Sequence, residues 1–209
     1  MITDIYFGSP VWIDNKPEFI NSANKASDEY IKEARTKNKS LIKDTGDFGL
    51  VHHSRQLLGD TRFKDFMDYI GRKAWDFLDW QGFDMKDYQT MFSEMWVQEF
   101  AKKGGGYHSL HVHSNDHISG FYFLKCSSKT SFLIFNDPRP GAQMTKLRLK
   151  KPTEVTHASS MVHHYPKPGM LLFFNSYLPH EFSVDIGKKP FRFIHFNLQS
   201  VLKGMAKNV

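Results

Sequence analysis

The chain has 209 residues, of which 40% are hydrophobic and 15% aromatic, and its formal net charge is +6. This length fits one domain spanning residues 1–209, and the apolar content excludes a disordered chain. The mild positive charge is consistent with an anionic partner or simply with a soluble surface.

The single cysteine, Cys126, excludes an intrachain disulfide, as is usual in a reducing compartment. The N-terminal stretch lacks the basic leader and apolar core of a secretion signal. No apolar run reaches the roughly 18 residues that a membrane-spanning helix needs. We therefore expect a soluble protein of the cytoplasm with no membrane partner.

The N-terminal part of the chain, residues 1–88, predicts one strand and supporting helices. Residues 4–13 read as a short strand or extended arm with a turn at 8–10. Residues 17–36 and 60–80 predict two helices, because apolar residues recur at helical spacing in both. Pro17 suits the first position of the earlier helix.

From about residue 90 the apolar pattern changes to alternation, which is typical of strands. Nine short strands are expected, at residues 91–101, 107–113, 119–126, 132–135, 145–149, 161–165, 170–174, 180–184 and 191–198. Many short strands separated by Gly- and Pro-containing turns indicate a sandwich, barrel or jelly roll. Residues 140–157 form the longest weakly patterned stretch, and loops of that length often cover active sites.

Three histidines suggest a metal site. His111 and His113 are two apart in an expected strand, so their side chains point to the same face, and His180 follows far downstream. Three ligands on one face of a metal leave positions open for oxygen and a substrate, as in non-haem iron oxygenases. The His-x-His pair alone is weak support, because alternating histidines also occur in ordinary cores. His108 has the opposite strand parity from His111 and is interpreted as a non-ligand.

Arg192 lies in the last expected strand. Pointing inward it would be a buried charge without compensation unless an anion met it, and a guanidinium fork suits a carboxylate. The alternative is an ion pair near the surface with Glu181 or Asp185.

The segment HVHSNDHISGFYFL, residues 111–124, resembles the motif H-x-H-P-N-S-x-x-S-G-V-Y-Y-L of an oxygenase family common in tailed phages and marine bacteria. That family belongs to the Fe(II)- and 2-oxoglutarate-dependent oxygenase superfamily. Other similar segments follow in the right order: IYFGSPVW (5–12), Trp96, LIFNDPR (133–139), PGMLLFFNSYLPH (168–180) and RFIHFN (192–197). The resemblance implies a mainly β fold with N-terminal helices and a double-stranded β-helix (jelly-roll, cupin-like) core over residues 89–200.

The resemblance also implies site residues. His111 takes the place of the first iron ligand and His180 that of the distal ligand, while His113 stands where the superfamily usually has Asp or Glu. Three neutral imidazoles would leave Fe(II) its full charge of 2+. Asp116 is an alternative second ligand, and its other interpretation is a loop residue or a partner for an imidazole.

For the cosubstrate, Arg192 takes the place of the residue that grips the far carboxylate of 2-oxoglutarate. Tyr122 takes the place of a tyrosine that hydrogen-bonds it, although register alone does not decide whether Tyr122 or Phe123 faces inward.

The implied activity is hydroxylation of an unactivated C–H bond in a peptidyl or small-molecule substrate. It would use Fe(II), 2-oxoglutarate and O₂ and release succinate and CO₂, in the host-cell cytoplasm if the chain is phage-encoded. Two alternatives are a three-histidine cupin-type dioxygenase that does not use 2-oxoglutarate and a non-catalytic jelly-roll binding module. The sequence lacks an aromatic-plus-basic stripe, so a nucleic-acid partner is not expected.

Overall fold

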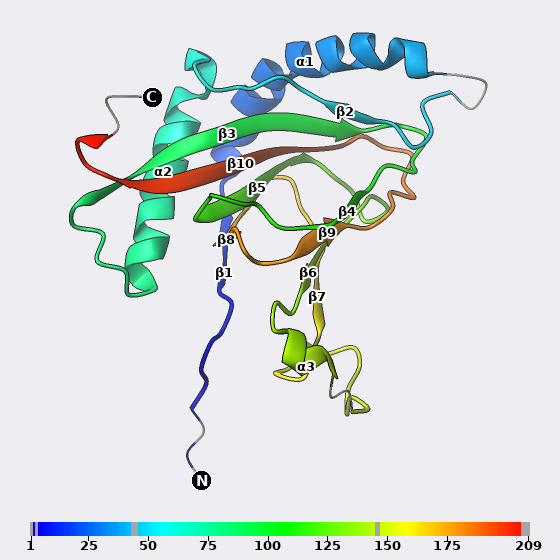
Figure 1. The fold of residues 1–209 in the computed structure, drawn as a ribbon. Helices are drawn as coiled ribbons and strands as arrows, with labels where there is room; N and C mark the ends of the chain where they lie inside the picture. Colours follow the sequence, from blue (N-terminus) through cyan, green and yellow to red (C-terminus); the bar gives the residue numbers. More distant parts are fainter. Residues whose placement is uncertain (1, 3, 43–45, 145–146, 206–209) are drawn as a thin grey trace.

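The computed structural model describes residues 2, 4–42, 46–144 and 147–205. Two antiparallel sheets form its centre (Figure 1). The larger has the order β1-β8-β5-β10-β3-β2, with bounds Val11–Asn15, Met170–Asn175, Ile118–Lys125, Phe191–Leu202, Tyr88–Phe100 and Val51–His53. The smaller has the order β4-β9-β6-β7, with bounds His108–His111, His180–Phe182, Leu133–Asn136 and Met161–His164. This is the expected jelly-roll core.

Two helices cover one face of the larger sheet, and the smaller sheet lies on its other side (Figure 1). Helix α1 spans Ile20–Lys37 and follows a short 3₁₀ turn at Pro17–Phe19, because proline fits the start of a helix. Helix α2 spans Lys64–Trp80 and is preceded by a turn in which the Asp60 side chain accepts a hydrogen bond from the Arg62 backbone. Both helices turn an apolar stripe toward the sheet.

Alternation along the strands of the larger sheet creates two separate cores. On β10, Ile194 and Phe196 pack toward the helices, whereas Phe191 and Phe193 pack between the two sheets. The space between the sheets is filled mainly by aromatic rings of both sheets: Trp96, Phe100, Phe121, Phe123, Phe135, Phe174, Phe182, Phe191 and Phe193. This aromatic core surrounds the inner ends of β4 and β9, where His111 and His180 are located.

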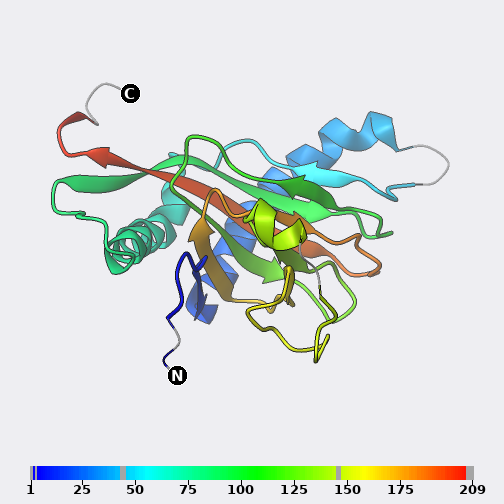
Figure 2. The same cartoon turned by 60° about the horizontal axis from the view of Figure 1, so that its bottom comes forward.

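The observed elements differ from the expected ones in three places. The strand expected at 145–149 begins on residues outside the described part, and residues 147–149 are not a strand; a short helix, α3 (Pro140–Met144), precedes them (Figure 2). Strand β2 was not expected, because it has only three residues in a polar stretch. The N-terminal strand is shifted to Val11–Asn15, where it pairs with β8 and joins the larger sheet.

None of the described helices combines the length and the hydropathy that crossing a membrane requires.

Candidate metal centre

Three histidines from two strands and a loop meet at one point. His111 ends β4 and pairs in register with His180, which begins β9. His113 follows β4, and its backbone N–H donates a 3.0 Å hydrogen bond to the carbonyl of Ser176. One potential ligand nitrogen of each histidine lies within 4.8 Å of the other two. The structure thus brings together the three residues that the sequence singled out as candidate ligands.

The hydrogen bonds of two of these rings prepare them to bind a metal. The Nδ1–H of His180 donates to the carbonyl of Leu178 (2.9 Å), and the Nδ1–H of His111 donates to that of Ser109 (2.7 Å). Each Nε2 therefore carries a lone pair. His180 is fully buried, and its Nε2 has no hydrogen-bond partner among the described residues. A buried acceptor without a partner is costly, so these residues fit a bound metal ion.

Burial keeps the imidazoles of His180 and His113 neutral. It lowers the pKa of His180 to about 2, and it lowers the pKa of His113 to about 3, with help from the neighbouring His195 and His111 rings. Neutral imidazole is the form that coordinates a metal, so no proton has to leave these two rings when an ion binds near neutral pH.

A carboxylate close to His113 is that of Glu94 on β3, which was not predicted. The amide of Asn197 donates a 2.7 Å hydrogen bond to Glu94 Oε1 and lies 3.0 Å from Nδ1 of His113. The ring of His195 stacks on that of His113 with their centroids 4.6 Å apart. Glu94, His195 and Asn197 all occupy positions of β3 and β10 that face the aromatic core. That parity, readable in the segments SEMW and IHFN, is the signal that could have found them.

Asp116, the alternative second ligand, is not among the residues that meet at the histidines. Its carboxylate accepts a 2.5 Å hydrogen bond from the Ser93 hydroxyl, and burial together with the nearby Glu94 raises its pKa. This position agrees with the other interpretation of Asp116, a loop residue beside the site.

Arg192 points away from the histidines. Position 192 faces the helices because it has the opposite strand parity from Phe193 and His195. Its Nε donates to Glu99 (2.7 Å) and its Nη1 to Asp28 (2.6 Å). The anion that compensates this buried arginine is thus a protein carboxylate, which differs from the expected contact with 2-oxoglutarate.

Tyr122 also faces the helices. Its hydroxyl donates a 2.6 Å hydrogen bond to the carbonyl of Lys16, and its ring packs on Phe66. The neighbouring Phe121 and Phe123 face the space between the sheets. Arg192 and Tyr122, the two residues expected to bind 2-oxoglutarate, therefore point away from the histidines, and their positions in this structure do not fit that role.

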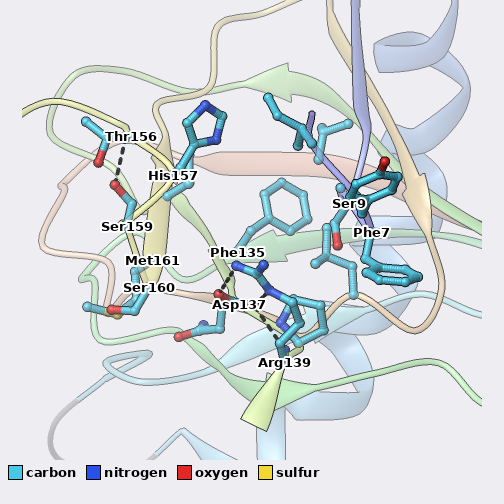
Figure 3. Close-up of a pocket in the computed structure, with 18 of the residues that line it drawn as sticks. Phe7, Ser9, Phe135, Asp137, Arg139, Thr156, His157, Ser159, Ser160 and Met161 are labelled. Atoms are coloured by element: carbon cyan, nitrogen blue, oxygen red, sulfur yellow. Dashed lines mark hydrogen bonds and ion pairs between the residues drawn. The ribbon is translucent and has the colours of Figure 1, made fainter. Parts of the chain in front are cut away.

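A cavity of about 640 Å³ lies between the N-terminal arm and the segment around Thr156 (Figure 3). Phe7 and Ser9 of the N-terminal arm lie on one side of it, and Thr156 and His157 lie on the other. Leu178 belongs to its lining and also accepts the hydrogen bond of His180. None of the three histidines lines the cavity, and Leu178 connects its lining to the ring of His180.

The lining of this cavity combines a charged pair with apolar side chains. Arg139 and Asp137 form an ion pair of 2.8 Å at the cavity (Figure 3). The ring of Phe135 lines the cavity and lies 6.3 Å from the ring of His180, measured between centroids. The side of the cavity toward His180 is thus apolar, and the Arg139–Asp137 ion pair lies elsewhere in its lining.

Comparison with known families gives one match, to the family described as "Putative 2OG-Fe(II) oxygenase", over residues 94–197. This range contains all three histidines of the site and the residues around them. No curated protein sequence matches the chain.

Solved structures with the same fold cover nearly the whole chain. AviO1 from Streptomyces viridochromogenes Tue57 has a TM-score of 0.61 and 13% identity, covering 91% of this chain and 90% of its own. EctD from S. alaskensis has a TM-score of 0.60 and 13% identity, covering 91% and 73%. A Pseudomonas putida prolyl-4-hydroxylase has a TM-score of 0.54 and 11% identity, covering 90% and 92%. The family match covers the β core, and these solved structures share the fold. The chain therefore belongs to the 2OG-Fe(II) oxygenases, enzymes that use Fe(II), 2-oxoglutarate and O₂.

Proposed function

We propose that this oxygenase holds Fe(II) with His111, His113 and His180 and hydroxylates a C–H bond of a peptidyl or small-molecule substrate. The observation that supports the ligand set is the convergence of three imidazoles within 4.8 Å, with the Nε2 of buried His180 lacking any partner among the described residues. Imidazole suits iron, and three protein ligands leave coordination positions open.

Fe(II), when bound there with the cosubstrate, supplies the oxidising chemistry of the family. The protein's part is to fix the ligands and to keep water away. Hydrogen bonds from His111 and His180 to backbone carbonyls fix the orientation of those two rings. Three aromatic rings surround His180, those of Phe174 (4.8 Å), Phe121 (5.6 Å) and Phe135 (6.3 Å), and they make that side of the site dry.

We assign the substrate to the cavity beside His180, because its lining includes Leu178 and Phe135, which both contact that histidine. A volume of about 640 Å³ is of the size that holds a small molecule or a short peptide segment.

The test is an anaerobic Fe(II) titration, with and without 2-oxoglutarate, followed by the weak visible charge-transfer band. Wild-type protein with Fe(II) and 2-oxoglutarate is expected to show this band, and His180→Ala to lose it. His163→Ala is the matched control, because His163 is exposed on β7. A charge-transfer band of unchanged intensity in folded His180→Ala protein would refute the ligand set.

The cosubstrate needs a separate measurement, because Arg192 and Tyr122 face the helices. Succinate release in step with oxygen uptake is expected from a 2-oxoglutarate-dependent enzyme. Oxygen uptake without succinate release would instead identify a three-histidine dioxygenase. The direction of Arg192, which points toward the helices and away from the histidines, favours this alternative.

A further inference from the structure

A second group of potential metal ligands lies beside the first. Glu94, His113 and His195 each offer one ligand atom, and these atoms lie within 4.8 Å of one another. Glu94 comes from β3 and His195 from β10, and both positions face the space between the sheets. The group contains two imidazoles and one carboxylate, the composition that the three-histidine set lacks.

His195 is the most unusual member of this group. Its side chain is 1% exposed, and among the described residues only the backbone of Gly120 lies close enough to its ring nitrogens for a weak hydrogen bond. A neutral imidazole has both a donor and an acceptor, so at least one buried nitrogen of this ring is left without a partner. Buried polar atoms almost always have partners, and those that lack one point to a missing ion or water.

The separation between His195 and Glu94 fits two ligands of one metal ion. Nε2 of His195 lies 3.6 Å from Oε1 of Glu94. This is longer than the roughly 2.7–3.2 Å of a hydrogen bond between nitrogen and oxygen. Two donor atoms that share one metal at about 2.0–2.2 Å lie about 3.0–3.5 Å apart, so a small movement would place both on one ion.

The neighbouring side chains hold this group in place. The Asn197 amide contacts both Glu94 and His113, and the Trp96 ring packs on His195 with centroids 4.6 Å apart. The side chain of Glu94 is 34% exposed, so an ion can reach its carboxylate from solvent while His195 stays buried. Preorganised ligands with one open side are what a metal site requires.

We propose that Glu94, His113 and His195 form a second site for a divalent transition metal, next to the three-histidine set. The two sites share His113, and a neutral imidazole has one free lone pair, so His113 serves one site at a time. Two imidazoles favour Fe²⁺, Co²⁺ or Zn²⁺ over Mg²⁺ or Ca²⁺, which prefer all-oxygen ligands. The carboxylate gives this site one negative charge, whereas the three-histidine set is neutral. The proposal does not depend on the catalytic role of His111 and His180.

The test uses Co²⁺ alone as the probe in a double variant, His111→Ala with His180→Ala, which removes the ligands that belong only to the first set. This variant is expected to bind one equivalent of Co²⁺, seen as visible absorption bands and by equilibrium dialysis. Adding Glu94→Gln is expected to abolish that binding. Glu94 is partly exposed, so its replacement should leave the fold intact, and circular dichroism and thermal unfolding check this for each variant.

Two controls separate a missing ligand from a damaged fold. The first control adds His52→Ala to the double variant. His52 is buried, like His195, but it lies opposite Glu99 of β3 on the face toward the helices. Its replacement should leave Co²⁺ binding unchanged. Glu154→Gln removes an exposed carboxylate and should also have no effect.

The possible results are distinct. A folded double variant that binds no Co²⁺, or one whose binding survives Glu94→Gln, overturns the second site. If the double variant binds Co²⁺ as tightly as wild type and only Glu94→Gln removes it, the second site stands and the three-histidine ligand set proposed above fails.

Discussion

Arg192 and Glu99 lie opposite each other on β10 and β3 and form an ion pair in which both side chains are almost completely buried. Arg35 and Asp28 extend this pair into a small network between the larger sheet and α1. The network lies on the face of β10 that is turned away from the histidines, so the conspicuous arginine of this strand is part of the packing between sheet and helix.

We expect Arg192→Met to lower the free energy of unfolding by about 3 kcal/mol, because it leaves Glu99 buried with only Arg35 as a partner. Metal affinity of the folded variant should stay unchanged. Urea unfolding and Co²⁺ titration measure the two effects. Arg139→Ala removes a more exposed ion pair and should change the free energy of unfolding much less than Arg192→Met does. A stable Arg192→Met protein with weakened 2-oxoglutarate binding would contradict this assignment.

Tyr122→Phe removes the hydrogen bond to the carbonyl of Lys16 and should cost about 1 kcal/mol of stability. The affinity for 2-oxoglutarate should not change, because the ring faces α2 and not the histidines. Thermal unfolding and a direct binding measurement test both statements. A loss of cosubstrate affinity with unchanged stability would show that the hydroxyl acts at the site.

The buried histidines predict a dependence of stability on pH in metal-free protein. The pKa of His180 is about 2 in the folded state, far below its ordinary value near 6.5, so the unfolded chain takes up a proton that the folded chain excludes. Stability should therefore be complete above about pH 6.5 and fall as the pH decreases, by about 2 kcal/mol from His180 alone at pH 5. In His180→Leu this part of the slope should vanish, whereas His163→Ala should retain it. Urea unfolding at pH 7 and pH 5 in the presence of a chelator gives the comparison.

Burial raises the pKa of the Cys126 thiol to about 12, so almost no thiolate exists at pH 8. Alkylation by iodoacetamide at that pH should be at least about 100-fold slower in the folded protein than in urea. Mass spectrometry of the alkylated fraction over time measures the ratio. Equal rates would mean that the thiol is accessible and ionised.

The sequence predicted the fold class and most of the strands, because alternation and turn residues are local signals. It also predicted that His111, His113 and His180 would meet, and the resemblance supported this by giving their order. The missed strand β2 is only three residues long and pairs with β3 through contacts that no local pattern records.

The face on which a strand residue lies was harder to predict. Arg192 and Tyr122 were expected near the histidines, yet both lie on the face of the larger sheet that packs against the helices. A register irregularity between His108 and His111 interrupts the count of alternating positions in β4. In β10 the alternation is regular, and it is this alternation that turns Arg192 toward the helices. Glu94 and His195 come from strands distant in sequence, so only the register between β3 and β10 shows that they meet.

The two faces of β10 also influence how this strand can fold. If β10 slipped by one residue, Arg192 would point into the aromatic core between the sheets. His195 would then point toward the apolar side chains of the helices. Both moves would bury polar groups without partners, and the arginine would lose Glu99 and Asp28. The ion pair on one face and the histidine on the other therefore penalise the same misregistered state, and they make correct pairing of the final strand a condition for a stable protein.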